Sequence, residues 1–325
     1  MLANKPKNAK IIGIGGYLPQ NILTNYDLEK IVETSNEWIV SRTGIKTRHI
    51  ANINNENTST LAYEAAKQAI AHAQINNQEI NLILVATSSG DYVFPAVACL
   101  VQNMLAIPGV PAYDISAACS GFVYALATAN AYIRSGQFKT ILVIGADTVS
   151  RFIDYTDKRT CILFGDGAGA VILQASTEEG VIATNIKADG SYTDILACKG
   201  QINNGKIYNK PYIDMDGQAV FKLAVKSILT MVEEILSNTG YNLDNIDLFI
   251  FHQANLRILE HIASNLKIPL NKLAITVDKH ANTSSASIPL ALNDCITNNK
   301  LKKGQLILML AMGGGFTWGA SLIRF

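Results

Sequence analysis

Short apolar runs alternate along the chain with stretches in which apolar residues recur every three or four positions. The apolar runs predict buried strands, and they fall at residues 81–89, 110–116, 139–147, 246–252, 273–278 and 305–311. The second pattern predicts amphipathic helices, of which the clearest are 59–74, 97–107, 218–240, 254–268 and 285–298. Strands that are apolar throughout and alternate with helices indicate sheets covered on both faces.

The order of these elements occurs twice. The first copy ends with a glycine-rich turn and an apolar strand at 164–173, and the second ends with a similar pair at 313–325. A repeat of this kind indicates two units that each leave an apolar face to cover. We therefore predict two halves, 1–180 and 181–325, packed about a pseudo-twofold axis as a five-layered αβαβα sandwich. We interpret the polar stretch 181–217 as a connector and surface elaboration between the halves.

The composition suits a large buried core and excludes several classes of protein. Of 325 residues, 49% are hydrophobic and 16% are charged, which is unlike a disordered chain. A formal net charge of +1 gives no global basic surface for nucleic acid. The N-terminus shows no signal or transit pattern, and no apolar run reaches membrane-spanning length. Five scattered cysteines without CxxC spacing suit a reducing compartment. We expect a cytoplasmic protein with no nucleic-acid partner and no membrane association.

Cys119 is the candidate nucleophile. It lies between the predicted strand 110–115 and the predicted helix 120–135, at the turn that leads into the helix. Unpaired N–H groups and the positive end of the helix dipole favour negative charge there, so the thiol pKa can be lowered. The alternative is a buried structural cysteine. That interpretation applies to the other four cysteines, Cys99, Cys161, Cys198 and Cys295.

Two polar residues of the second half also follow predicted strands. His252 closes the strand 246–252, and Asn282 lies in the polar loop after the strand 273–278. Taken singly, His252 could be a capping or core residue, and Asn282 a turn former. Ligands bind at the carboxyl edge of α/β sheets, and two such edges can meet at one cleft. A thiol from one half with an imidazole and an amide from the other is a suitable set for acyl transfer.

Longer motifs around these residues are similar to one enzyme family. They are TSNEWIVSRTGIKTRHIA, DISAACSGF, FGDGAGAVIL, HQANLRI, HANTSSASIP and the terminal GGGFTWGASLIRF. Together they resemble β-ketoacyl-acyl carrier protein synthase III, the initiating condensing enzyme of type II fatty-acid synthesis and a member of the thiolase superfamily. The resemblance runs from Ile11 to Phe325, and it implies a thiolase-like fold.

The resemblance implies a homodimer and an acyltransferase reaction in two stages. A short acyl-CoA, with acetyl-CoA the expected primer, first acylates Cys119, and CoA leaves. Malonyl-acyl carrier protein then loses carbon dioxide, and the resulting carbanion attacks the acyl group. The products are a 3-oxoacyl-carrier protein, CoA and carbon dioxide. CoA is therefore a substrate and a product, and the resemblance implies no cofactor and no metal.

The resemblance also assigns roles to residues at matching positions. His252 and Asn282 would donate hydrogen bonds to the malonyl thioester carbonyl. The backbone N–H groups of Cys119 and Gly314 would form an oxyanion hole. The remaining matches are Trp38, Arg42, Lys158, Arg159 and Asn255 for CoA binding, Lys222 and Arg257 for the carrier protein, and Phe94 for the acyl pocket of the partner subunit.

Some positions depart from the family pattern. Lys158 replaces an arginine that stacks on the CoA adenine, Ser264 and Asn265 replace a basic pair, and Met312 stands where an aromatic residue is common. A guanidinium is flat and an ammonium is not, so Arg159 could take over the stacking. Three alternatives stay open: a secondary-metabolism relative with the same Cys/His/Asn set, a simple thioesterase, and a non-catalytic dimeric homologue. The motifs do not determine the length or branching of the primer.

Overall fold

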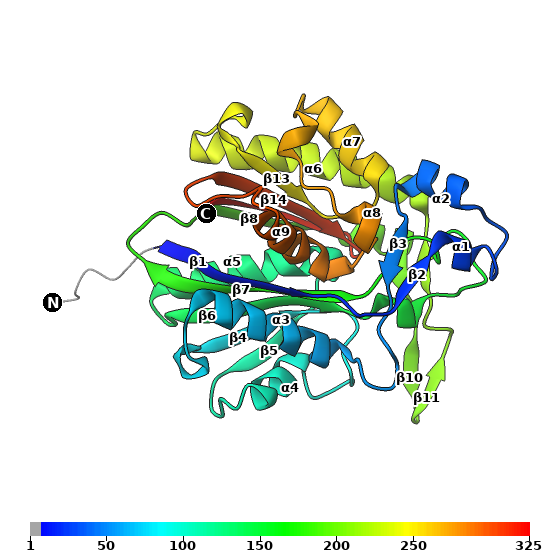
Figure 1. Cartoon of the computed structure of the whole chain (residues 1–325), viewed down its shortest axis with the longest axis horizontal. Helices are drawn as coiled ribbons and strands as arrows, with labels where there is room; N and C mark the ends of the chain where they lie inside the picture. Colours follow the sequence, from blue (N-terminus) through cyan, green and yellow to red (C-terminus); the bar gives the residue numbers. More distant parts are fainter. Residues whose placement is uncertain (1–7) are drawn as a thin grey trace.

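Two β-sheets form the framework of the molecule (Figure 1). The computed structural model describes residues 8–325. The first sheet has the strand order β1-β7-β6-β4-β5. Its strands are β1 (Asn8–Tyr17), β4 (Leu82–Ala86), β5 (Ala112–Ile115), β6 (Thr140–Asp147) and β7 (Gly167–Ser176). β4 runs parallel to β5 and β6, whereas β7 runs antiparallel to β6 and β1. β4 and β6 are buried along their whole length, as their continuous apolar sequences predict.

The second sheet includes a strand that the sequence did not reveal. Its order is β13-β14-β15-β8, with β13 (Leu248–Phe251), β14 (Leu306–Gly313), β15 (Thr317–Arg324) and β8 (Val181–Ala188). The interpretation of 181–217 as connector was therefore wrong for its first eight residues. β8 is an edge strand and becomes exposed toward its end. Its sequence consequently lacks the continuous apolar run by which fully buried strands are recognised.

The strand predicted at 273–278 is not formed. Only Leu273 pairs with β13, through a single bridge, and helix α8 (Val277–His280) begins before the predicted strand ends. After residue 274, which still donates to β13, the backbone bonds to a side chain instead of a neighbouring strand. The Gln253 amide oxygen accepts from the N–H groups of Thr276 (2.8 Å) and of the next residue (3.2 Å). The apolar pattern correctly indicated burial, but it did not specify the backbone partner.

Helices lie in three layers around the two sheets. The following helices make up these layers: α5 (Gly121–Ser135) and α9 (Ser287–Thr297) between the sheets, α3 (Thr58–Ala73) and α4 (Val97–Met104) on the outer face of the first sheet, and α6 (Gly217–Thr239) and α7 (Leu256–Asn265) on that of the second (Figure 1). The predicted αβαβα sandwich is therefore confirmed.

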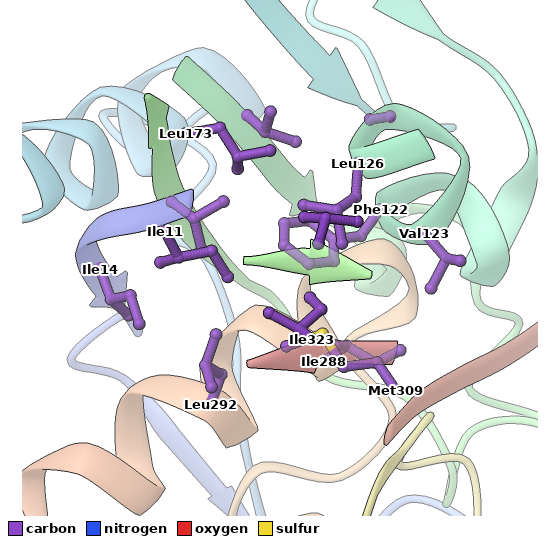
Figure 2. Close-up of a cluster of buried hydrophobic side chains, with 14 of the residues drawn as sticks. Ile11, Ile14, Phe122, Val123, Leu126, Leu173, Ile288, Leu292, Met309 and Ile323 are labelled. Atoms are coloured by element: carbon purple, nitrogen blue, oxygen red, sulfur yellow. The ribbon is translucent and has the colours of Figure 1, made fainter. Parts of the chain in front are cut away.

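The middle layer joins the two halves into one apolar core. Figure 2 shows its side chains, which come from α5 (Phe122, Leu126), α9 (Ile288, Leu292), the first sheet (Ile11, Leu173) and the second sheet (Met309, Ile323). All of them are buried. Separation of the sheets would expose this shared cluster to water, which is unfavourable in proportion to its apolar area. The chain passes from one sheet to the other between β7 and β8, and we propose the boundary of the halves at residue 180.

The shorter elements gather at one end of the sheets. Several of them are seen on the right of Figure 1. They are β2 (Ile22–Thr24), α1 (Asn25–Leu28), α2 (Asn36–Thr43), β3 (Thr47–His49), β9 (Leu196–Cys198), β10 (Gln201–Asn203), β11 (Lys206–Tyr208) and β12 (Ile213–Met215). None of the helices between residues 8 and 325 combines the length and apolar character that a membrane crossing requires.

Candidate active site

A short turn holds Cys119 at the start of α5. After β5, residues Ala118–Ser120 form one turn of 3-10 helix that leads directly into α5. Ala118 has a left-handed φ of 46°, which is uncommon for a residue with a side chain. The Thr317 hydroxyl, at the start of β15, donates to the Ala117 carbonyl (3.0 Å). The turn is thereby fixed to the second half of the chain.

Gly313 lies against the backbone of the same turn. An added Cβ at Gly313 would come within 2.6 Å of the Cys119 nitrogen and 3.0 Å of the Ser120 nitrogen. Glycine therefore lets the end of β14 approach the N–H groups at the helix start, where negative charge is favoured. The next residue, Gly314, lines a cavity together with Cys119.

Burial controls the protonation of Cys119. It raises the pKa of the thiol to about 12; a hydrogen bond with the Ser284 side chain lowers this pKa, and the Asp147 carboxylate raises it. The expectation of a lowered pKa was therefore wrong. Desolvation of the thiolate outweighs the donors at the helix start.

His252 directly follows β13 and is almost completely buried. Its backbone N–H donates to the Leu310 carbonyl of β14 (2.8 Å), which continues the pairing of the two strands. Nδ1 lies 2.6 Å from the Ser287 hydroxyl oxygen, whereas Nε2 makes no hydrogen bond within residues 8–325. Burial lowers the pKa of His252 to about 3, so the imidazole is neutral.

A backbone bridge between the halves fixes Asn282. Its N–H donates to the Leu163 carbonyl (2.9 Å), and its own carbonyl accepts from the Gly165 N–H (3.0 Å). Asn282 thereby pairs with Phe164 as in a parallel sheet. The Ser284 N–H donates to the amide oxygen Oδ1 (2.9 Å). In the described part of the chain the Nδ2 group has no such partner, and its two hydrogens are available to a ligand.

Cys119, His252 and Asn282 line one cavity of about 320 Å³. The structure thus brings together a thiol from the first half and two polar side chains from the second. Gly313 lines the cavity as well. Chemically, a sulfur that can carry an acyl group shares this cavity with an imidazole and an amide that can donate hydrogen bonds. Such donors are most effective where oxygen gains charge in a transition state.

Four of the five residues expected to bind CoA line the same cavity: Trp38, Arg42, Arg159 and Asn255. Trp38 and Arg42 lie one turn apart on α2, and Arg42 Cζ is 5.9 Å from the centre of the indole ring. Trp38 is 38% exposed, so its indole can stack on a flat ligand. Asn255 caps α7 by accepting from the Arg257 N–H (2.8 Å), and it donates to the Arg42 carbonyl (3.1 Å). Its amide thus joins α7 to α2.

The two basic candidates for adenine stacking are placed differently. Lys158 is not part of the cavity lining, but its Nζ lies 5.9 Å from the centre of the Trp38 ring. Arg159 lines the cavity, but its guanidinium is paired with Asp157 (Nη2 to Oδ2, 2.8 Å). Two cations, those of Lys158 and Arg42, therefore lie near the Trp38 ring, whereas that of Arg159 is paired with Asp157.

The remaining predicted residues lie outside the cavity. Lys222 on α6 and Arg257 on α7 are exposed, on two helices that pack against each other. Phe94 lies in the loop before α4 and is 84% exposed. Their predicted roles require partners, and they stay predictions.

A second cavity, of about 230 Å³, also reaches Cys119. Most of its lining is apolar and includes Val149, Phe152 and Ile213, whereas Ser284 and Asp147 are polar. The sulfur-bearing residue therefore lies where a larger and a smaller cavity meet. The smaller one is suited to an apolar acyl chain.

Asp147 links the two halves beneath these cavities. It is fully buried and accepts hydrogen bonds from the Ser88 N–H (2.8 Å) and the Ser89 hydroxyl (2.8 Å) of the first half. Its other oxygen accepts from the N–H (3.0 Å) and hydroxyl (2.7 Å) of Ser285 in the second half. The segment that follows Asn282 is thereby attached to the half that carries Cys119.

Asp147, Ser284 and Ser287 were not among the residues predicted from the sequence. The signal was the motif NTSSAS, in which serines follow Asn282 at short intervals. Serines in such a loop are typical turn formers, and nothing in the pattern distinguishes one that contacts a catalytic candidate.

Comparison with known proteins then decides the family. Residues 113–190 match the family 3-oxoacyl-[acyl-carrier-protein] synthase III, and residues 236–325 match its C-terminal family. The β-ketoacyl-[acyl-carrier-protein] synthase III of Laribacter hongkongensis is 50% identical, over 98% of this chain and 99% of its own length. The chain belongs to the β-ketoacyl-[acyl-carrier-protein] synthase III family. It is an acyltransferase of fatty-acid synthesis.

Further relatives agree with this family. The β-ketoacyl-[acyl-carrier-protein] synthase III of Neisseria gonorrhoeae is 51% identical, over 98% of this chain and 99% of its own length. The crystal structure of 3-oxoacyl-[acyl-carrier-protein] synthase III from Aquifex aeolicus is 48% identical and has a TM-score of 0.93, covering 98% of this chain and all of that one. The thiolase-like fold expected from the resemblance is therefore confirmed.

Proposed function

We propose that the chain condenses a short acyl-CoA, acetyl-CoA first among candidates, with malonyl-acyl carrier protein through a thioester on Cys119. The observation that carries this proposal is the single cavity lined by Cys119, His252 and Asn282. Packing of the fold does not require that these three polar side chains lie at the same cavity. A nucleophile beside two hydrogen-bond donors is what a decarboxylative condensation needs.

In the first half-reaction the Cys119 sulfur attacks the thioester carbonyl of the acyl-CoA. The new Sγ–C bond forms, the bond from that carbon to the CoA sulfur breaks, and the thiol proton ends on CoA. We propose that the backbone N–H groups of Cys119 and Gly314 donate hydrogen bonds to the developing oxyanion. Both residues line the smaller cavity. The acyl chain would occupy the apolar part of that cavity.

In the second half-reaction the malonyl thioester takes the place of CoA in the larger cavity. His252 and Asn282 would donate hydrogen bonds to its carbonyl oxygen. As carbon dioxide leaves, the electron pair of the broken C–C bond passes into the enolate that these donors stabilise. The enolate carbon then attacks the acyl carbonyl, the C–Sγ bond breaks, and the Cys119 thiolate takes up a proton from solvent. A neutral imidazole suits this role because it can donate a hydrogen bond without carrying a charge in a buried position.

The larger cavity is the proposed path of the CoA and carrier-protein arms. Trp38, Arg42 and Lys158 offer an aromatic face and two cations to a nucleotide, with Arg159 and Asn255 beside them. For the carrier protein, which we expect to be acidic, Lys222 and Arg257 are the proposed contacts on α6 and α7. Charge contacts of this kind mainly accelerate encounter.

We further propose a homodimer in which Phe94 reaches the acyl pocket of the partner subunit. The loop residues Tyr92, Val93 and Phe94 are 62%, 80% and 84% exposed, and adjacent exposed apolar side chains mark interaction surfaces. β5 is an edge strand of the first sheet, and an edge can pair with another strand. Sedimentation velocity tests the dimer. The scattered cysteines suit a reducing compartment, so we propose a cytoplasmic location.

The function is tested by incubation of the enzyme with malonyl-acyl carrier protein and a panel of acyl-CoAs. We expect a 3-oxoacyl-carrier protein and an acyl adduct on the wild-type chain by intact mass. Cys119→Ser should lose both. Product formation with other acyl acceptors only would favour a secondary-metabolism acyltransferase, free acid would favour a thioesterase, and no turnover would favour a non-catalytic homologue.

A further inference from the structure

The second half-reaction requires one particular form of His252. A neutral imidazole carries a single proton, on either Nδ1 or Nε2, and only the protonated nitrogen can donate. Nδ1 is occupied by Ser287, so Nε2 must be the donor to the malonyl carbonyl. The position of one proton therefore decides whether His252 can act, and the residue at Nδ1 controls it.

Ser287 is the first residue of α9, and it is buried beside the imidazole. Its hydroxyl oxygen lies 2.6 Å from Nδ1, which is a short hydrogen bond between two enclosed groups. The same oxygen accepts a weaker hydrogen bond from the Gln253 backbone N–H (3.4 Å). Ser287 thus meets one definite donor and one ring nitrogen whose role depends on the tautomer.

Counting hydrogens resolves the ambiguity. If Nδ1 carried the proton, two N–H groups would point at the Ser287 oxygen. The hydroxyl hydrogen would then have no acceptor, since within residues 8–325 the hydroxyl contacts no other polar atom. If the hydroxyl donates to Nδ1, the Gln253 N–H, the hydroxyl and the ring nitrogen are all satisfied. The hydrogen on Nε2 then has no acceptor among residues 8–325, but His252 lines the larger cavity, from which water or substrate can accept it. The tautomer with its proton on Nε2 is therefore favoured, because the other one encloses a hydroxyl hydrogen that neither protein nor cavity can accept.

We propose that Ser287 is a positioning residue that holds His252 in the tautomer with its proton on Nε2, aimed at the substrate carbonyl. This inference rests on the proposed function for its catalytic consequence. It assigns to α9 a role beyond packing. The helix that fills the middle of the sandwich also sets the protonation pattern of the site at its first residue.

The direct test is the tautomer itself. In the full-length enzyme labelled with 15N-histidine, long-range 1H–15N spectra distinguish protonated from unprotonated ring nitrogens. The chain has five histidines, and the spectrum of His252→Ala identifies the His252 signals. We expect protonated Nε2 in the wild type, and a shift toward protonated Nδ1 in Ser287→Ala. Protonated Nδ1 in the wild type, or an unchanged tautomer in Ser287→Ala, would overturn the proposal.

The kinetic test separates the two half-reactions. In Ser287→Ala, acylation of Cys119 by acetyl-CoA should stay within about twofold, because His252 is not needed there. Decarboxylation of malonyl-carrier protein should fall by roughly 10- to 100-fold, less than for complete loss of a donor. Equal slowing of both half-reactions, or an undiminished decarboxylation rate, would contradict a role through His252.

Two further variants guard against trivial explanations. Ser287→Thr keeps the hydroxyl and should keep the Nε2 proton, which tests the proposal even if the alanine variant folds poorly. Ser285→Ala removes a hydroxyl two residues away that bonds to Asp147 and the Ala86 carbonyl but not to His252. Its His252 signals should match the wild type.

If the wild type itself never decarboxylates malonyl-carrier protein, the proposed function fails. The tautomer measurement uses no substrate and still decides the role of Ser287.

Discussion

At the scale of single residues, Cys119 must ionise in surroundings that disfavour a thiolate. Burial raises the pKa of its thiol to about 12, so the thiolate is a minor species at neutral pH. Since a raised pKa means that ionisation increases as the pH rises, the rate of acylation should increase steadily from pH 6 to pH 9. The hydrogen bond from Ser284 works against burial and makes the sulfur more reactive.

Ser284→Ala should therefore slow alkylation and acylation of Cys119 at neutral pH. We expect a decrease of roughly tenfold, the value of one charge-assisted hydrogen bond, with the pH profile displaced to higher pH. Mass spectrometry after iodoacetamide treatment measures the rate at Cys119. The exposed Cys99 serves as an internal control in the same sample. A profile that does not move would remove Ser284 from any role at the sulfur.

His252 and Asn282 should matter in the second half-reaction only. His252→Ala and Asn282→Ala are expected to form the acyl-enzyme, because the sulfur and its helix start are untouched. Decarboxylation should fall by about 10²–10³-fold in each, as for loss of one preorganised donor. Release of labelled carbon dioxide from malonyl-carrier protein checks this. Normal release in both variants would show that decarboxylation in this cavity depends on other groups.

At the scale of elements, the end of β14 is shaped for the turn that carries Cys119. A Cβ at Gly313 would meet backbone nitrogens at 2.6 Å and 3.0 Å, and backbone moves less readily than a side chain. The close approach of strand end and helix start is therefore a requirement on the residue type. It also brings Gly314 to the cavity beside the sulfur.

Gly313→Ala should destabilise the fold by about 1–3 kcal/mol and also slow acylation, because the turn must shift. Urea unfolding and acyl-enzyme formation are the two measurements. Gly190→Ala is a matched control, since an added Cβ there meets nothing within 4 Å. If both variants had the same stability and the same acylation rate, the close contact expected for a Cβ at residue 313 would be wrong.

The helices and strands also show which features could be predicted from the sequence and which could not. The buried strands and amphipathic helices follow from apolar spacing, and Cys119, His252 and Asn282 were found because each follows a predicted strand. The edge strand β8 escaped because half-exposed strands carry polar residues. The segment 273–278 was misassigned because burial does not name a hydrogen-bond partner. Ser284 and Ser287 were beyond reach, since contacts between distant segments leave no local pattern.

At the scale of the whole molecule, the layer of α5 and α9 makes the halves interdependent. Side chains of this layer contact both sheets, so loss of packing there is felt on both sides. We therefore expect the enzyme to unfold in one transition despite its duplicated architecture. Such cooperativity follows from a shared core, whereas separate cores allow separate transitions.

Leu292→Ala tests this expectation. Leu292 is fully buried on α9, and its truncation should cost about 2–5 kcal/mol. Urea unfolding followed by far-UV circular dichroism and tryptophan fluorescence should still give coincident curves, shifted together. The control is Leu270→Ala, whose side chain is 54% exposed and whose loss should be nearly neutral. Two resolved steps in the Leu292 variant would mean that each half holds its own core.

The pairing of Phe164 with Asn282 has a genetic consequence. Asn282 is positioned by the main chain of residues 163–165, which belong to the half that carries the nucleophile. We expect a substitution of Gly165, which lines neither cavity, to leave Cys119 able to accept the primer but to block the condensation that should follow. A screen for acyl-enzyme formation would classify such a mutant as normal, and only an assay for the condensation product would reveal the defect.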